Sequence, residues 1–180
     1  MKSGIFLIAP LSGPVAERVL EVQRWADPRM AAGLAPHITL VGSSGVGPMP
    51  IDTPLPLIRE LLEPIAADTQ PLTLQFQRPH RFMQTEIVVL PLDPYGALRT
   101  LHERIASSGL RFESPRFTFS PHCTLSFYPT LTVENERKLM ALRVDEPVVI
   151  ERLEVYHTPF PQPSRKILEL TLGQGVTASA

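Results

Sequence analysis

The pentapeptide Pro-His-x-Thr-Leu occurs twice in the sequence, as PHITL at residues 36–40 and as PHCTL at residues 121–125. Imidazole has a pKa near 6.5, so two histidines can serve at neutral pH as one base and one acid. Threonine hydroxyls can donate hydrogen bonds to phosphate oxygens. Together these groups would suit hydrolysis of a cyclic phosphodiester, in which water loses a proton on one side of phosphorus and the leaving oxygen gains one on the other.

Each motif is predicted to lie on a β-strand, where successive side chains point to opposite faces. His37 and Thr39 then share one face, while Ile38 and Leu40 enter the core. The second copy predicts a polar face of His122, Thr124 and Ser126 over an apolar face of Cys123, Leu125 and Phe127. A duplicated chain would relate the two polar faces by a pseudo-twofold axis, so we expect them to meet across one cleft.

A similar order of elements leads to each motif. Apolar runs at residues 5–11 and 87–92 both end in Pro-Leu and predict strands. The first is followed by Pro14 at a helix start, with apolar residues at helical spacing from 15 to 26. The second is followed by a helix with an apolar face at 98, 101 and 105, which Gly109 can close.

Further helices and strands follow both motifs. Leu57, Leu61 and Ile65 predict a helix that Pro64 shortens or kinks, and a second helix is expected at about residues 132–143. Alternating patterns predict strands at residues 71–77, 152–157 and 166–172. This order predicts an α+β fold, bilobal and duplicated, with two antiparallel sheets flanked by helices around a central cleft.

We therefore expect residues 1–180 to form one domain of two lobes, about 4–80 and 84–172, with a flexible tail at 173–180. The net charge of −1 argues against a long footprint on duplex nucleic acid. A single cysteine excludes an internal disulfide and fits the reducing cytoplasm. The first apolar run is better explained as a buried strand than as a signal peptide, and no run is long enough to span a membrane.

The paired His-x-Thr motifs resemble those of the two-histidine (2H) phosphoesterase superfamily. This superfamily includes bacterial RNA 2',3'-cyclic phosphodiesterases, also called 2'-5' RNA ligases, and plant cyclic phosphodiesterases, and the resemblance covers about residues 4–172. It implies metal-independent opening of 2',3'-cyclic phosphates to 2'-phosphates, with no cofactor. By this resemblance His37 and His122 are catalytic, Thr39 and Thr124 bind phosphate, His122 activates water and His37 protonates the leaving 3'-oxygen.

One position departs from the family pattern. Many bacterial ligase-like members carry Arg five residues after the second histidine, where this chain has Phe127 followed by Tyr128. An aromatic residue at this position is more similar to the pattern of the plant-type phosphodiesterases. We therefore expect hydrolysis rather than RNA ligation. A non-catalytic module that binds RNA ends or nucleotides is the alternative, although binding alone would need neither an acid nor a base. A metallohydrolase is disfavoured because neither motif contains a carboxylate.

The expected partner is a nucleotide or an RNA end with a 2',3'-cyclic phosphate, and no obligate protein partner or membrane is indicated. Possible substrate-binding residues are Tyr128, Arg81, Phe82 and Gln77, with Arg78 and Gln75 nearby. The Pro-rich segment 159–165 is expected to form a rim or lid. We expect His80, His102 and His157 to be structural or surface residues, because none repeats the His-x-Thr pattern. Cys123 lies on the buried side of its predicted strand, so we expect a core residue rather than a nucleophile.

Overall fold

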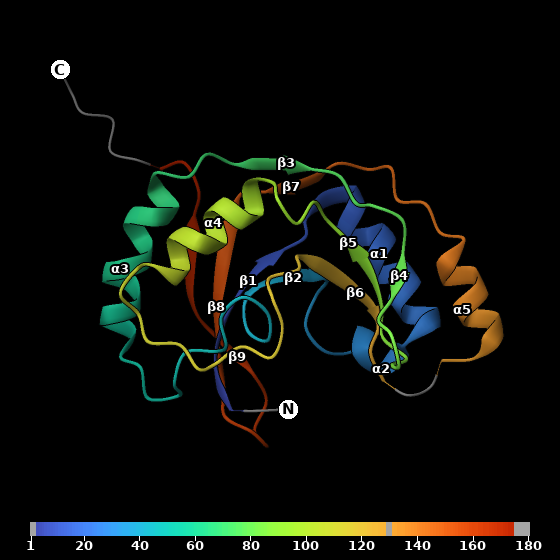
Figure 1. Ribbon diagram of the computed structural model, residues 1–180, viewed down its shortest axis with the longest axis horizontal. Helices are drawn as coiled ribbons and strands as arrows, with labels where there is room; N and C mark the ends of the chain where they lie inside the picture. Colours follow the sequence, from blue (N-terminus) through green and yellow to red (C-terminus); the bar gives the residue numbers. More distant parts are fainter. Residues whose placement is uncertain (1–2, 129–130, 175–180) are drawn as a thin grey trace.

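A computed structural model describes residues 3–128 and 131–174 of the chain (Figure 1). The helices are α1 (Gly13–Ala26), α2 (Pro28–Ala31), α3 (Leu55–Ala67), α4 (Ala97–Ala106) and α5 (Val133–Met140). The strands are β1 (Gly4–Pro10), β2 (His37–Val41), β3 (Leu72–Leu74), β4 (His80–Arg81), β5 (Val88–Pro91), β6 (His122–Ser126), β7 (Val148–Ile150), β8 (Arg152–Thr158) and β9 (Arg165–Thr171). The predicted α+β fold class is confirmed.

The described strands form two antiparallel sheets of unequal size. Seven strands pair in the order β4-β5-β6-β2-β1-β8-β9, and β3 pairs with β7 in a separate ribbon. The main sheet combines distant parts of the chain, because β8 and β9 lie beside β1 while β2 and β6 join its two halves. The two sheets therefore do not correspond to the two halves of the sequence, contrary to the expectation. The division into lobes at about 4–80 and 84–172 stays a prediction.

Helix α1 follows its sequence pattern closely. Pro14 lies in its first turn, and the buried apolar residues are Val15, Val19, Val22 and Ala26. Helix α4 likewise buries Leu98, Leu101 and Ile105. It ends at Ala106, and the predicted stop residue Gly109 adopts a positive φ of 94° that a side chain would disfavour.

Helix α3 differs from the prediction in the face that it buries. The expected apolar stripe began at Leu57, but this residue is 40% exposed, and the buried residues are Ile58, Leu62 and Ala66. The helix also continues through Pro64 to Ala67. Helix α5 is shorter than expected and begins after Thr132, whose hydroxyl accepts a hydrogen bond from the Asn135 N–H at 3.1 Å.

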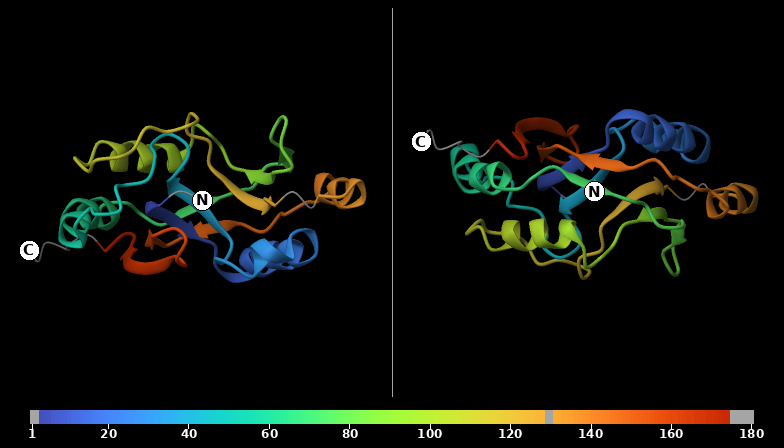
Figure 2. Two further views of the ribbon diagram at one scale, coloured as in Figure 1. Left: turned by 90° about the horizontal axis from the view of Figure 1, so that it is seen from below. Right: turned by 90° about the horizontal axis from the view of Figure 1, so that it is seen from above.

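The helices gather at two ends of the main sheet. Helices α3 and α4 lie at one end and α1, α2 and α5 at the other, and α1 and α4 occupy opposite sides of the strands (Figures 1 and 2). No described helix is long and apolar enough to cross a membrane. Gly173 of the predicted tail lies in a turn directly after β9, and residues 175–180 lie outside the described part of the chain.

Candidate active site

The two motifs meet where β2 and β6 pair. Ile38 is the register partner of Cys123, so the middle residues of the two copies lie opposite each other. Antiparallel pairing then places His37 across from Thr124 and Thr39 across from His122. Diagonal neighbours in such a pair are about 7–8 Å apart, which leaves room for one phosphate between the two imidazoles.

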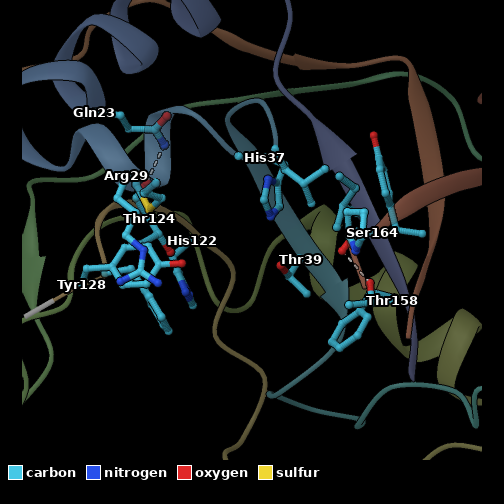
Figure 3. Close-up of a pocket in the computed structure, with 17 residues that line it drawn as sticks. Gln23, Arg29, His37, Thr39, His122, Thr124, Tyr128, Thr158 and Ser164 are labelled. Atoms are coloured by element: carbon cyan, nitrogen blue, oxygen red, sulfur yellow. Dashed lines mark hydrogen bonds between the residues drawn. The ribbon is translucent and has the colours of Figure 1, made fainter. Parts of the chain in front are cut away.

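All four motif side chains line one cleft of about 580 Å³ (Figure 3). This volume lies within the range of roughly 300–1,000 Å³ that small-molecule sites occupy. The apolar partners of the motif, Ile38, Leu40, Cys123 and Leu125, are fully buried, as the strand pattern predicted. The other lining residues include Phe6, Ile8, Gln23, Arg29, Met30, Leu34, Phe127, Tyr128, Tyr156, Thr158, Pro163 and Ser164.

The proline of each motif belongs to a repeated backbone arrangement. The Leu11 N–H donates to the Pro36 carbonyl at 2.9 Å, and the Leu92 N–H donates to the Pro121 carbonyl at 3.0 Å. His37 is in register with Pro10, and His122 is in register with Pro91. Each histidine is thus held at the start of its strand by the Pro-Leu end of the preceding strand, in the same backbone arrangement for both motifs.

The two imidazoles are oriented in the same way. Nδ1 of His37 donates to the Ala35 carbonyl at 2.7 Å, and Nδ1 of His122 donates to the Ser120 carbonyl at 2.7 Å. A carbonyl can only accept, so Nδ1 carries the proton in both rings and Nε2 has the lone pair when the ring is neutral. Each Nε2 can therefore take up or give a proton, and has no hydrogen-bond partner among the described residues.

The surroundings lower the pKa of both motif histidines. Burial is the main cause in each case, but the neighbouring charges differ. Burial lowers the pKa of His37, opposed by its bond to the Ala35 carbonyl and by the negative charge of Glu154. Burial also lowers the pKa of His122, opposed by its bond to the Ser120 carbonyl, while the charge of His37 lowers it further. The neighbouring charges thus act in opposite directions, because Glu154 stabilises the protonated form of His37 whereas the charge of His37 opposes protonation of His122.

Glu154 is a buried carboxylate that the sequence analysis did not select. It is 6% exposed, and it accepts a hydrogen bond from the Tyr156 hydroxyl at 3.0 Å and forms ion pairs with Lys166 at 3.2 Å and Arg152 at 3.5 Å. The alternating pattern of residues 152–157 already placed Glu154 and Tyr156 on one face of a strand. Its nearness to the first motif required the register of β1 with both β2 and β8.

Tyr128, Gln23 and Arg29 form the wall of the cleft beside the second motif. The Arg29 guanidinium lies 4.0 Å from the centre of the Tyr128 ring, and Gln23 donates to the Thr124 carbonyl at 2.8 Å. Gln23 and Arg29 were missed, although the sequence Asp27-Pro28 is a typical helix start that could have indicated α2. Tyr128 was a predicted substrate-binding residue, and the structure places it in the cleft wall.

The other predicted substrate-binding residues are not among those that line the cleft. Arg81 forms an ion pair with Glu136 at 2.7 Å, and Gln77 is exposed. Phe82 has an indirect connection, because its ring packs edge-to-face on the His122 ring with centroids 5.2 Å apart. A role of these three residues in substrate binding stays a prediction. Pro163 and Ser164 do line the cleft, so part of segment 159–165 forms its rim.

Ser126 and Phe127 follow Thr124, and both differ from the prediction in their exposure to solvent. Ser126 was expected on the polar face of the cleft, but it is fully buried and its hydroxyl has no hydrogen-bond partner among the described residues. Phe127 was expected in the core, but it is 52% exposed and lines the cleft. Phe127 takes this position because β6 ends at Ser126, where the carboxylate of Asp27 accepts the N–H groups of Phe127 and Tyr128.

Three residues that were expected to be structural or surface residues, His80, His102 and Cys123, are not among those that line the cleft. His102 is buried, stacks on Phe119 with centroids 3.9 Å apart, and donates from Nδ1 to the Leu40 carbonyl at 2.8 Å. His80 is exposed. Cys123 is fully buried, and burial raises the pKa of its thiol to about 12. Among the described residues, no three His, Cys, Asp or Glu side chains are grouped closely enough to hold a metal ion.

Comparisons with known proteins agree with this geometry. A family model described as the 2'-5' RNA ligase superfamily matches residues 11–158. LigT of E. coli in complex with 3'-AMP has a similar fold, with a TM-score of 0.60, 16% sequence identity, and coverage of 96% of this chain and 99% of LigT. TT0787 of Thermus thermophilus matches with a TM-score of 0.62 and 15% identity, over 96% of this chain and 98% of TT0787.

A further solved structure, described as a phosphoesterase, matches with a TM-score of 0.55 and 19% identity, over 96% of this chain and all of the other. A search of curated protein sequences finds no significant match. At these identities the solved structures establish the fold, while the family model matches more than half of the chain and confirms the resemblance inferred from the paired motifs.

Proposed function

The chain belongs to the 2'-5' RNA ligase superfamily, and from this premise we propose that it hydrolyses 2',3'-cyclic phosphodiesters to 2'-phosphates. The substrates would be RNA ends, nucleotides, or a related cyclic ADP-ribose phosphate. The observation that carries the proposal is the meeting of both His-x-Thr motifs in one cleft. The cleft wall also favours an anion, because its described residues include Arg29 and both histidines but no carboxylate.

The proposed reaction is an in-line displacement at phosphorus. Neutral His122 accepts a proton at Nε2 from water, whose oxygen forms a new bond to phosphorus. The bond from phosphorus to the 3'-oxygen breaks, and protonated His37 gives its Nε2 proton to that oxygen. The products are a 2'-phosphate and a free 3'-hydroxyl. Thr39 and Thr124 donate to the non-bridging oxygens, whose hydrogen bonds strengthen as charge develops.

The charges around the two imidazoles support this assignment of roles. Glu154 favours a protonated His37, which suits an acid, and the positive charge of His37 favours a neutral His122, which suits a base. The opposite assignment would place the acid beside a cation and the base beside a carboxylate. The two motifs have the same local structure, and Glu154 of β8 makes their electrostatic surroundings different.

A nucleotide ligand is supported by the fold neighbours. LigT of E. coli has been crystallised with 3'-AMP, with ATP and with NADP+. We propose hydrolysis rather than ligation for this chain because Phe127 places an apolar ring in the cleft wall at the position where many ligase-like members carry Arg.

The direct test is incubation of the protein with the four nucleoside 2',3'-cyclic monophosphates in the presence of EDTA. We expect conversion to nucleoside 2'-phosphates at a rate that the chelator does not change. A 3'-phosphate product would contradict the proposed leaving group, and loss of activity with EDTA would point to metal catalysis. Tight binding without any product would favour the non-catalytic module. Addition of an RNA with a 5'-hydroxyl in the same assay would report ligation.

A substrate with an activated leaving group tests the two roles, since its departure needs little help from an acid. His37→Ala should recover much of its lost rate with such a substrate, whereas His122→Ala should not. Recovery of His122→Ala alone would reverse the assignment. Recovery of neither variant would mean that positioning of the phosphate, rather than proton transfer, is the main contribution of the imidazoles.

A further inference from the structure

The described cleft lining has a single permanent positive charge, the guanidinium of Arg29. Arg29 is exposed and forms no ion pair with a described carboxylate, and its one side-chain interaction among the described residues is with the face of the Tyr128 ring. Arginines away from the cleft, such as Arg59 and Arg81, have glutamate partners at 2.5 and 2.7 Å. The cleft thus contains a cation whose charge is available to a ligand.

Both members of the Arg29–Tyr128 pair are fixed by one buried carboxylate. Asp27 is 1% exposed, and one of its oxygens accepts the Met30 N–H at 3.0 Å at the start of α2, the helix that carries Arg29. Its other oxygen accepts the N–H groups of Phe127 at 2.8 Å and Tyr128 at 2.9 Å. The backbone segments that carry the guanidinium and the ring are therefore connected before any ligand binds, which lowers the entropic cost of binding.

The pair lies at the end of the cleft that carries the second motif. The cyclic phosphate must lie between His37 and His122, over the central pairing of β2 and β6. In Figure 3 Arg29 groups with Tyr128, Thr124 and His122 at one end of the cleft, well away from Thr158 and Ser164 at the other end. Because both histidines and both threonines are already assigned to the reacting phosphate, the charge of Arg29 is available to another anionic group of the same substrate.

We propose that Arg29 binds a second phosphate of the substrate, on the 5' side of the nucleoside that carries the cyclic phosphate. A guanidinium presents two parallel N–H donors that match a phosphate, and its planar face remains stacked on Tyr128. This inference rests on the proposed hydrolysis of cyclic phosphates and narrows its substrate class. The preferred substrates are RNA ends or nucleotides with a 5'-phosphate, rather than nucleoside 2',3'-cyclic monophosphates.

The first experiment compares two substrates, adenosine 2',3'-cyclic phosphate and its 5'-phosphorylated form. We expect the parent protein to hydrolyse the 5'-phosphorylated substrate with a kcat/KM about fivefold higher, as for one charge-assisted contact at a solvent-exposed position. In Arg29→Met this ratio should fall close to one, and Arg29→Lys should lie between. The matched control is Arg24→Met, an exposed arginine of α1 that is not among the cleft-lining residues, which should keep the parent ratio.

A second experiment measures binding without turnover. Titration calorimetry should give a Kd about fivefold lower for adenosine 2',5'-bisphosphate than for adenosine 2'-phosphate with the parent protein, and nearly equal values with Arg29→Met. A preference that survives in Arg29→Met, or that is absent from the parent, would overturn the inference. If the parent binds with this preference but hydrolyses neither substrate, the second-phosphate site stands and the proposed reaction fails. If hydrolysis occurs without the preference, the reaction stands and the site fails.

Discussion

Replacement of Asp27 by alanine should destabilise the protein far more than an ordinary polar substitution. Asp27 is almost fully buried and accepts three backbone N–H groups, from Met30, Phe127 and Tyr128, at 2.8–3.0 Å. These bonds connect the α1–α2 junction to the end of β6, about a hundred residues later in the chain. Alanine would leave all three N–H groups without this acceptor.

The expected loss can be estimated bond by bond. A helix-capping aspartate contributes about 1 kcal/mol, and each hydrogen bond to a buried charged group contributes about 1.5–3 kcal/mol. Because the two N–H groups after β6 share one oxygen, we expect a total near 3–5 kcal/mol, below the simple sum. For a chain of this size that corresponds to a decrease in Tm of roughly 10 °C. Asp27→Asn keeps one acceptor oxygen and should lose about half as much.

Thermal and urea unfolding would measure these losses in the free energy of unfolding. Asp68→Asn is a suitable control, because Asp68 is 80% exposed and its ion pair with Arg104 should contribute less than about 1 kcal/mol. If Asp27→Ala unfolds within about 1 kcal/mol of the parent protein, the reasoning about this junction is wrong. A folded Asp27→Asn should also lose part of the preference for a 5'-phosphate, because Arg29 and Tyr128 would be held less firmly.

Three further outcomes are expected. Thr39→Ala and Thr124→Ala should each lower kcat/KM on the order of 10–10³-fold, as for loss of one transition-state donor, and an unchanged rate would exclude phosphate contacts. Burial lowers the pKa of both motif histidines, so kcat/KM should follow a bell centred below pH 6.5. Glu154→Gln should lower the pKa of His37 further and reduce the rate selectively on the alkaline side, because an acid must be protonated; a gain of rate on the acid side alone would reverse the roles. Because burial raises the pKa of Cys123 to about 12, iodoacetamide at pH 8 should not modify the folded protein, and rapid alkylation would contradict a buried thiol.

Much of the fold was predictable because the paired motifs and the helical patterns are local signals. The alternation in the two motifs correctly divided His37 and His122 from the core residues beside them. In α3 the pattern was ambiguous, because two adjacent stripes, one through Leu57 and one through Ile58, are both apolar, and only packing decides which is buried. Strand pairing over long distances, as of β1 with β8, has no comparable local signal.

The site residues that were missed depend on contacts between distant segments. Glu154 influences His37 only because β8 pairs with β1, which pairs with β2. Arg29 faces the cleft because Asp27 binds the backbone after β6, and the same contact turns Phe127 out of the predicted core position. Alternation predicts the direction of a side chain only as far as the strand continues, and the end of β6 is set by a tertiary hydrogen bond.

The central claim is that His37 and His122 act on one phosphate, and the rate of hydrolysis of a nucleoside 2',3'-cyclic monophosphate by the single alanine variants tests it most directly. Each of His37→Ala and His122→Ala should lower kcat by about 10²–10⁴-fold without changing the unfolding transition. His80→Ala, at an exposed histidine that does not line the cleft, should keep a rate close to that of the parent protein. Near-full activity in either motif variant would contradict the account.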